Sequence, residues 1–163
     1  MAHTHLVFYS GKIIETTVTY RASLVDDWVR HIRSMYEGQN ILVGLDLDYI
    51  PESIASFVSN PNITFVGVEV EETITKLRNE YGLCCINTAD IRALAKRRFP
   101  LSVRGKPGLK AIANQLVELH MRKPKHICKR NWESRVLDKE QIEHACVDAY
   151  AIYRIGHKLL KEM

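Results

Sequence analysis

The sequence predicts an α/β domain, and two apolar runs separated by a short helical segment indicate this fold class. Residues 41–45 (ILVGL) are too few for a helix and lie between Gly38 and Pro51. Residues 63–70 (ITFVGVEV) form the second run. Short continuous apolar runs are typical of strands buried on both faces, and strands that a helix connects are usually parallel. We therefore expect a sheet flanked by helices, in a single domain spanning residues 1–163.

Local signals predict the remaining elements in chain order. Two β-rich segments, 6–9 and 13–20, flank Ser10-Gly11 and indicate a hairpin with a tight turn. Capping residues, apolar spacing and helix-ending Gly or Pro predict the helices. These helices span residues 24–35 with Ser23 as N-cap, 51–58, 71–81, 91–98, 109–119, and 139–161 with Asp138 as N-cap. A short strand is expected at residues 84–86, and residues 123–132 are expected to be irregular.

Charge is distributed unevenly along the chain. Residues 96–135 contain 12 Lys or Arg and 2 acidic residues, whereas the other segments contain 11 basic and 17 acidic residues. Such a basic segment favours a phosphate-rich partner, although a solvated helix face would explain part of it. The candidate nucleic-acid contacts are Lys123, Lys125, Lys129 and Arg130.

Composition argues against several other classes of protein. No apolar run approaches the roughly 18 residues of a membrane span, so no membrane partner is expected. The first residues do not have the charged-then-apolar layout of a signal peptide. The four cysteines show no CxxC spacing, which makes a zinc site or a disulfide framework improbable and fits a reducing compartment, the cytoplasm or the nucleus.

Two pairs of polar residues are candidates for chemistry. Asp46 and Asp48 follow the first apolar run, and side chains two apart on a strand point to the same face. They could bind a hard metal ion, or the strand could simply end in solvent. On the last predicted helix, His144 and Asp148 are four residues apart and share a face.

Three stretches of the chain resemble a known family. They are residues 60–83 (NPNITFVGVEVEETITKLRNEYGL), 107–119 (PGLKAIANQLVEL) and 131–160 (NWESRVLDKEQIEHACVDAYAIYRIGHKLL). Together they resemble the Werner-syndrome-type 3′–5′ exonuclease domain, in the DEDDy branch of the DnaQ-like, RNase H-fold nucleases. Residues 12–28 (KIIETTVTYRASLVDDW) look most like the small stand-alone members found in plants.

The resemblance implies an RNase H-like mixed sheet flanked by helices and a site that holds Mg²⁺ or Mn²⁺ on carboxylates. It implies hydrolysis from the 3′ end of RNA or single-stranded DNA. Asp46 matches the Asp of the family's D-x-E motif, and Asp48 stands at its Glu. Asp148 matches the Asp of the Y-x-x-x-D motif, where His144 replaces the water-orienting Tyr. His144 could act as a base, or it could be an exposed residue without a role.

The chain also departs from the family pattern. Thr73 stands where the second metal-binding Asp is expected, with Glu71 and Glu72 as neighbours that could compensate. The antiparallel strands that normally follow the first motif are expected to be missing, so Asp48 could instead belong to the next segment. These departures imply a weak nuclease or, alternatively, an inactive exonuclease-fold protein that binds nucleic acid or pairs with an active nuclease subunit. Missing strands would leave a free sheet edge, which favours a homo-oligomer.

Overall fold

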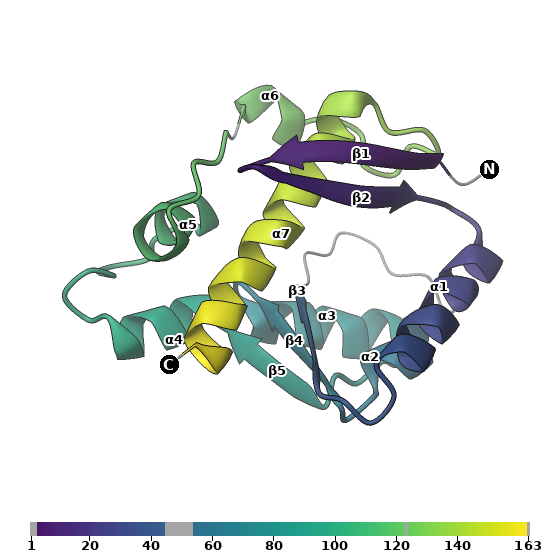
Figure 1. The fold of residues 1–163 in the computed structure, drawn as a ribbon, viewed down its shortest axis with the longest axis horizontal. Helices are drawn as coiled ribbons and strands as arrows, with labels where there is room; N and C mark the ends of the chain where they lie inside the picture. The colour runs from purple at the N-terminus through teal and green to yellow at the C-terminus, as the bar shows by residue number, and fades with distance from the viewer. Residues whose placement is uncertain (1–2, 45–53, 123, 163) are drawn as a thin grey trace.

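Two small sheets and one long helix organise the molecule. The computed structural model describes residues 3–44, 54–122 and 124–162. A parallel sheet has the strand order β3 (Ile41–Gly44), β4 (Ile63–Gly67), β5 (Asn87–Asp90), and a separate antiparallel hairpin pairs β1 (His3–Tyr9) with β2 (Lys12–Val18). The hairpin lies across the N-terminal half of the long helix, and the parallel sheet lies against its C-terminal half (Figure 1).

The helices cover both faces of the parallel sheet. They are α1 (Ala22–Met35), α2 (Ala55–Val58), α3 (Val70–Tyr81), α4 (Ile91–Arg98), α5 (Leu109–Val117), α6 (Lys125–Cys128) and the long helix α7 (Lys139–Lys161). Helices α1 and α2 form one hydrophobic cluster with one face of β4. Helices α4, α5 and α7 form a larger cluster with the opposite face of β4. The predicted α/β arrangement, with helices flanking a sheet, is confirmed.

Strand β4 is buried on both faces, as its continuous apolar run predicts. Ile63 and Phe65 pack with Val29 of α1 and Phe57 of α2, whereas Val66 packs in the cluster that includes α7. Successive side chains of a strand point to opposite faces, so one short strand contributes to two hydrophobic clusters. This central strand therefore fixes the helix layers relative to each other.

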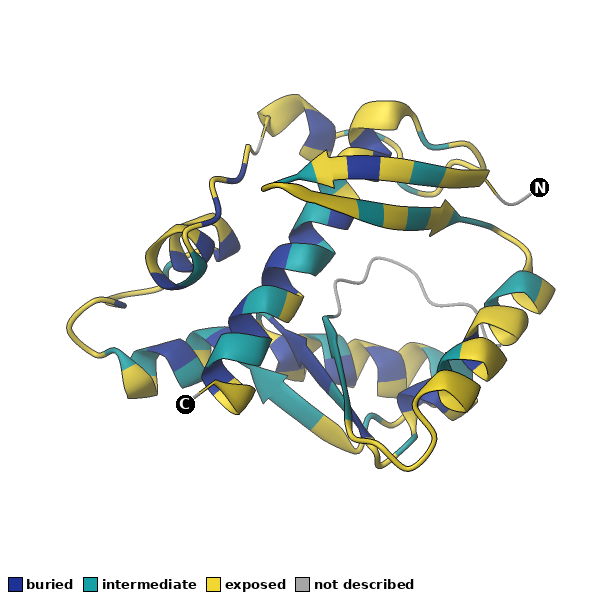
Figure 2. Cartoon of the chain, in the orientation of Figure 1, coloured by how far each residue is buried: buried dark blue, intermediate teal, exposed yellow. Residues whose placement is uncertain are grey.

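Helix α7 is the long helix against which both sheets pack. Its inward positions are buried along most of its length, whereas the outer face of the hairpin is exposed (Figure 2). Gly156 permits a close approach to the sheet, because an added Cβ would lie 2.7 Å from a methyl carbon of Val66. Near its other end the helix meets the hairpin, where the Thr16 hydroxyl donates to the Cys146 sulfur at 3.1 Å.

The hairpin turn is confirmed. Ser10 and Gly11 both have positive φ angles, 49° and 72°. Positive φ at both central residues is characteristic of the two-residue turns that match the twist of paired strands. The strands on either side are in register from His3 opposite Val18 to Tyr9 opposite Lys12. Tyr9 is therefore held immediately before a tight turn.

Several predicted boundaries are wrong, each for a local reason. The strand expected over residues 63–70 ends at Gly67, because Glu69 adopts a left-handed conformation (φ 56°) and Val70 begins α3. Helix α1 starts at Ala22 with Arg21 as N-cap, so Ser23 lies inside the first turn and not at its cap. The segment expected to be irregular, 123–132, contains the short helix α6.

The third strand also lies away from its predicted position. A strand was expected at residues 84–86, but β5 comprises Asn87–Asp90. Ile86 is 58% exposed, and pairing with β4 starts where Asn87 lies opposite Thr64. The strand sequence NTAD lacks the apolar run that marks β3 and β4, so hydrophobicity indicates the wrong residues.

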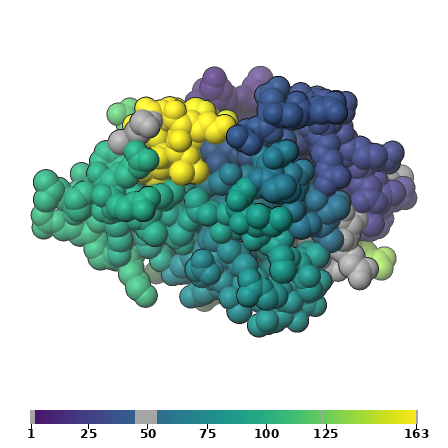
Figure 3. Space-filling model, turned by 90° about the horizontal axis from the view of Figure 1, so that it is seen from below, coloured from purple at the N-terminus to yellow at the C-terminus, as the bar shows by residue number. Residues whose placement is uncertain are grey.

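Two further features complete the fold. None of the helices in the described ranges is both long and apolar enough to cross a membrane. In the space-filling view from below, the segment that follows α4 extends to one side of the molecule, beside the C-terminal end of α7 (Figure 3).

Residues 45–53 fall outside the described residues, so the helix start at Pro51 and the expected loss of antiparallel strands stay predictions.

Candidate active site at the carboxyl end of the sheet

Asp148 is the acidic residue of the candidate site that the structure describes. It lies in the middle of α7 and is 5% exposed. Gln141 and Asp148 are the buried polar or charged residues in the described part of the chain. Burying a carboxylate is unfavourable unless a cation or hydrogen-bond donors compensate it. The burial of Asp148 therefore requires neighbouring groups that offset the lost hydration of its carboxylate.

The end of strand β3 lies against the turn of α7 that carries Asp148. An added Cβ at Gly44 would lie 2.6 Å from the carbonyl oxygen of Ala149 and 2.9 Å from the amide nitrogen of Tyr153. Only glycine allows this approach, because backbone atoms of α7 occupy the space of a side chain. Gly44, two residues before Asp46, therefore lies against the backbone of Ala149, the residue that follows Asp148. Asp46 and Asp48 themselves lie outside the described residues.

His144 lies one helical turn before Asp148, on the same face of α7. Its Nε2 atom is 3.8 Å from a carboxylate oxygen of Asp148, and its ring centroid is 6.1 Å from that of Trp132. The side chain is only 12% exposed, so His144 is not the exposed residue that one interpretation of the sequence suggested. The 3.8 Å separation is longer than a hydrogen bond and still allows a favourable interaction if the imidazole is protonated.

Thr73 occupies the position at which the family pattern expects a second acidic ligand. It lies in the first turn of α3, where its amide donates to the Glu69 carbonyl, and its side chain is half-buried. Its neighbours Glu71 and Glu72 are exposed in the same turn, as acidic residues favoured by the helix dipole often are. Thr73 has a hydroxyl in place of a carboxylate, and the carboxylates of Glu71 and Glu72 are exposed. None of the three residues therefore supplies a buried carboxylate.

The described residues fit a divalent cation only in part. The buried carboxylate of Asp148 is the type of oxygen ligand that Mg²⁺ and Mn²⁺ prefer. No group of three or more His, Cys, Asp or Glu side chains in the described ranges is arranged to hold a metal ion. Of the three predicted ligands, Asp148 is the one that the structure describes, and Asp46 and Asp48 lie outside the described residues.

Tyr9 is a residue near this site that the sequence pattern does not reveal. It belongs to the hairpin, and its ring packs edge-to-face on Tyr150 of α7 with centroids 6.1 Å apart. Burial raises the pKa of Tyr9, and the negative charge of Asp148 raises it further. Tyr9 is 139 positions from Asp148, so only the folded structure brings the two together.

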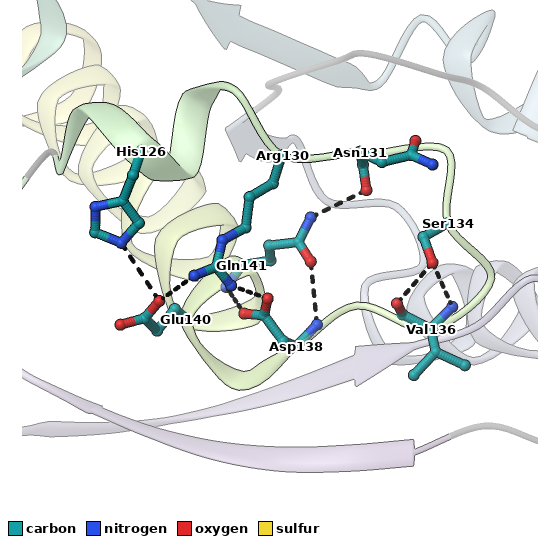
Figure 4. Close-up of polar contacts among 8 residues, drawn as sticks. All are labelled: His126, Arg130, Asn131, Ser134, Val136, Asp138, Glu140 and Gln141. Atoms are coloured by element: carbon teal, nitrogen blue, oxygen red, sulfur yellow. Dashed lines mark hydrogen bonds and ion pairs between the residues drawn. The ribbon is translucent and has the colours of Figure 1, made fainter.

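The basic segment is attached to the N-terminal end of α7 by a cluster of polar contacts, which we call the clasp (Arg130, Asp138, Glu140 and Gln141; Figure 4). Arg130 forms ion pairs with Asp138 and, at 2.8 Å, with Glu140. Asp138 and Gln141 form a reciprocal capping box at the start of the helix. Asp138 is thus confirmed as the N-cap.

The four predicted nucleic-acid contacts differ in their surroundings. Lys125 and Lys129 are exposed, whereas the guanidinium of Arg130 is engaged by the two carboxylates of the clasp. Lys123 lies outside the described residues. Among the described members of the set, Lys125 and Lys129 are the exposed residues.

Comparison with known proteins identifies the family of the chain. A sequence model of the 3′–5′ exonuclease family matches residues 27–163. A 3′–5′ exonuclease of Arabidopsis thaliana is 30% identical over 114 residues, which cover 70% of this chain and 38% of the relative. The human exonuclease 3′–5′ domain-containing protein 2 is 27% identical over 100 residues, covering 61% of this chain and 16% of that protein. The chain thus spans less than half the length of these relatives.

Solved structures show the same architecture at low sequence identity. RNase D of Escherichia coli superposes with a TM-score of 0.70 at 15% identity, covering 88% of this chain and 44% of that one. RNase D of Trypanosoma brucei gives 0.67 at 12% identity, with coverages of 83% and 62%. NrnC of Brucella melitensis, of which a structure with bound Mg²⁺ exists, gives 0.57 at 20% identity, with coverages of 69% and 52%. The fold is therefore RNase H-like, and the chain belongs to the 3′–5′ exonuclease family.

Proposed function

We propose that this chain hydrolyses phosphodiester bonds from the 3′ end of RNA or single-stranded DNA, slowly and in a metal-dependent manner. The observation that carries the proposal is the buried carboxylate of Asp148 beside the end of β3, in a chain of the 3′–5′ exonuclease family. A bound Mg²⁺ or Mn²⁺ ion would supply an activated water and would stabilise the leaving oxygen.

The residues of the chain have distinct roles in this proposal. Asp148 is an ion ligand, and Asp46 and Asp48 are the proposed ligands from the segment that follows Gly44. His144 stands in for the tyrosine of the family motif and orients the attacking water. Thr73 leaves the site one carboxylate short, so we expect weak binding of two ions or binding of a single ion. This deficit is the reason for the slow rate.

The direct test is degradation of a 3′-labelled single strand with Mg²⁺ or Mn²⁺. We expect Asp148→Asn and Asp46→Asn to abolish turnover. The matched control is Glu143→Gln, which removes an exposed carboxylate from the same helix. It should leave turnover unchanged. Activity that survives both aspartate changes would come from a contaminating nuclease and would exclude the hydrolytic proposal.

The second candidate is a catalytically inactive exonuclease-fold protein that binds nucleic acid or pairs with an active nuclease. The half-buried Thr73 favours it, because a hydroxyl cannot supply the charge of a carboxylate at a metal. The double change Thr73→Asp with His144→Tyr separates the two candidates. An inactive wild type that gains turnover through these changes would have an intact scaffold that lacks only the chemistry.

Nucleic acid and further protein chains are the proposed partners. Exposed Lys125 and Lys129 support an electrostatic contact with phosphates. Among the described strands, β3 pairs on one side only, with β4, so its other edge could pair with a second copy of the chain. Light scattering on the purified chain would test this homo-oligomer, and a single monomer mass at micromolar concentration would exclude it. A reducing compartment, cytoplasm or nucleus, is the proposed location.

A further inference from the structure

Tyr9 and Tyr150 contact each other through their rings, but their hydroxyl groups differ. The hydroxyl of Tyr150 accepts a hydrogen bond from Arg154 Nη1 at 3.2 Å. The hydroxyl oxygen of Tyr9 is buried, and no hydrogen-bond partner for it is found in the described part of the chain. Buried polar groups nearly always have a partner, because leaving one unpaired is unfavourable. The Tyr9 hydroxyl therefore needs an explanation.

The backbone around Tyr9 holds it in one place. Tyr9 is the last residue of β1, opposite Lys12, and the tight Ser10-Gly11 turn follows directly. Its ring is fixed at 89° to that of Tyr150, and four residues earlier on α7 the Cys146 sulfur accepts from Thr16 of β2. The hairpin is thus attached to α7 at two successive turns, on either side of Asp148.

Asp148 lies on α7 between Cys146 and Tyr150, the two residues through which the hairpin contacts the helix. Desolvation is the largest cause of the raised pKa of Tyr9, and the negative charge of Asp148 is the second. A negative carboxylate favours a neutral hydroxyl that presents its hydrogen. Carboxylates that bind metal ions are themselves commonly oriented by such neighbouring donors.

We propose that Tyr9 is a positioning residue for Asp148, and that its hydroxyl donates a hydrogen bond toward the Asp148 carboxylate, directly or across one water, when this carboxylate binds a divalent cation. The proposal rests on the role of Asp148 as an ion ligand. It makes the hairpin a part of the active site, because the hairpin carries the donor. It also explains why a tyrosine stands where phenylalanine would preserve the ring packing.

The test compares Tyr9→Phe with Tyr150→Phe in the full chain. Both changes remove only a hydroxyl from the same ring contact. We measure the Mn²⁺ dissociation constant by calorimetry, and the melting temperature with and without saturating Mn²⁺. Loss of a group that orients a metal ligand typically weakens metal binding about 10–100-fold. We expect this for Tyr9→Phe and a change of less than about twofold for Tyr150→Phe.

Stability gives an independent readout. The hydroxyl has no hydrogen-bond partner among the described residues, so Tyr9→Phe should leave the melting temperature measured without Mn²⁺ unchanged or raise it by a few degrees. It should reduce the stabilisation that Mn²⁺ confers. An unchanged Mn²⁺ affinity would overturn the proposal. A loss of melting temperature of equal size with and without Mn²⁺ would also overturn it, because it would indicate a merely structural role.

The outcomes distinguish this inference from the proposed function. If the wild type binds Mn²⁺ but does not degrade a 3′-labelled strand, the hydrolytic function fails, and the affinity of Tyr9→Phe still decides the inference. If the strand is degraded and Tyr9→Phe binds Mn²⁺ normally, the inference fails alone. If the wild type does not bind Mn²⁺, Asp148 is not an ion ligand, and the inference is overturned together with the proposed cofactor.

Discussion

The two ends of α7 are held in contrasting ways. The N-terminal end is attached to the basic segment by the clasp, whose ion pairs are solvent-exposed. Beyond Asp148 the helix is embedded by close contacts, with Gly44 against the backbone of Ala149 and Gly156 against Val66. Exposed ion pairs contribute little to stability, whereas changes in a packed interior have large effects.

This contrast implies that the site and the basic surface can be perturbed separately. The position of Asp148 depends on the embedded part of α7 and on the hairpin. The position of Lys125 and Lys129 depends on the clasp. A change in the packed part should therefore alter stability and chemistry together, and a change in the clasp should alter stability by a smaller amount.

The largest effect is expected where β3 meets α7. Gly44→Ala would place a Cβ 2.6 Å from a backbone oxygen, which can move only if α7 moves. Overpacking of this kind destabilises by about 1–3 kcal/mol, and we expect a value at the upper end. Urea denaturation measures it, and the Asp148-dependent Mn²⁺ affinity should fall in the same variant. A stable Gly44→Ala protein would contradict the close approach.

Gly156→Ala provides the matched comparison. Its added Cβ would meet the methyl groups of Val66 at 2.7 and 3.0 Å, and these belong to a side chain that can be shortened. We expect Val66→Ala to recover part of the stability that Gly156→Ala loses, so that the double variant is more stable than the sum of the single changes predicts. Strict additivity would contradict the contact.

A smaller loss is expected from Gln141→Ala. The buried side chain of Gln141 accepts from the Asp138 amide at 3.1 Å and donates to the Asn131 carbonyl at 3.2 Å. Losing these bonds should destabilise by about 1–2 kcal/mol in urea denaturation. Glu143→Ala, an exposed change on the same helix, is the control and should remain within about 0.5 kcal/mol of the wild type.

Acid should weaken the clasp. The amide hydrogen bond from Gln141, followed by the contact with Arg130, lowers the pKa of Asp138. A carboxyl group with a lowered folded-state pKa stabilises fully above its unfolded value of about 4 and loses this contribution as the pH falls through the folded value. Melting curves should therefore show a stability advantage of wild type over Asp138→Asn at pH 7 that shrinks below about pH 4. An advantage independent of pH would contradict the charged clasp.

The smallest effect is expected from the surface lysines. Replacing Lys125 and Lys129 with Gln should lower the affinity for single-stranded RNA several-fold at low salt, and should reduce the slope of log affinity against log salt by about 1.4. Lys139→Gln, which removes an exposed charge outside the basic segment, is the control. Equal losses in both variants would show only a general charge effect.

The sequence predicts the elements that hydrophobicity specifies. Strands β3 and β4 and helix α7 lie close to their expected positions, because burial on one or both faces imposes a readable pattern on the residues. Strand β5 does not, since NTAD carries no apolar run and forms through pairing with β4. Boundaries that depend on backbone conformation, such as the left-handed Glu69, are also not visible in a hydrophobic pattern.

The site is predictable only where spacing along the chain matters. The four-residue separation of His144 and Asp148 places both on one face of α7, as observed. Tyr9 and Gly44 could not be identified as part of the site, because their contacts with α7 are tertiary and join residues more than 100 positions apart. Departures such as Thr73 are visible in the sequence, but their burial is not.

A crystal structure of the chain soaked in Mn²⁺, with anomalous scattering to locate the ions, tests the central claim most directly. We expect a manganese peak coordinated by a carboxylate oxygen of Asp148 and by an oxygen of Asp46 or Asp48. Manganese bound only at other acidic residues, with Asp148 uncoordinated, would contradict the proposed site.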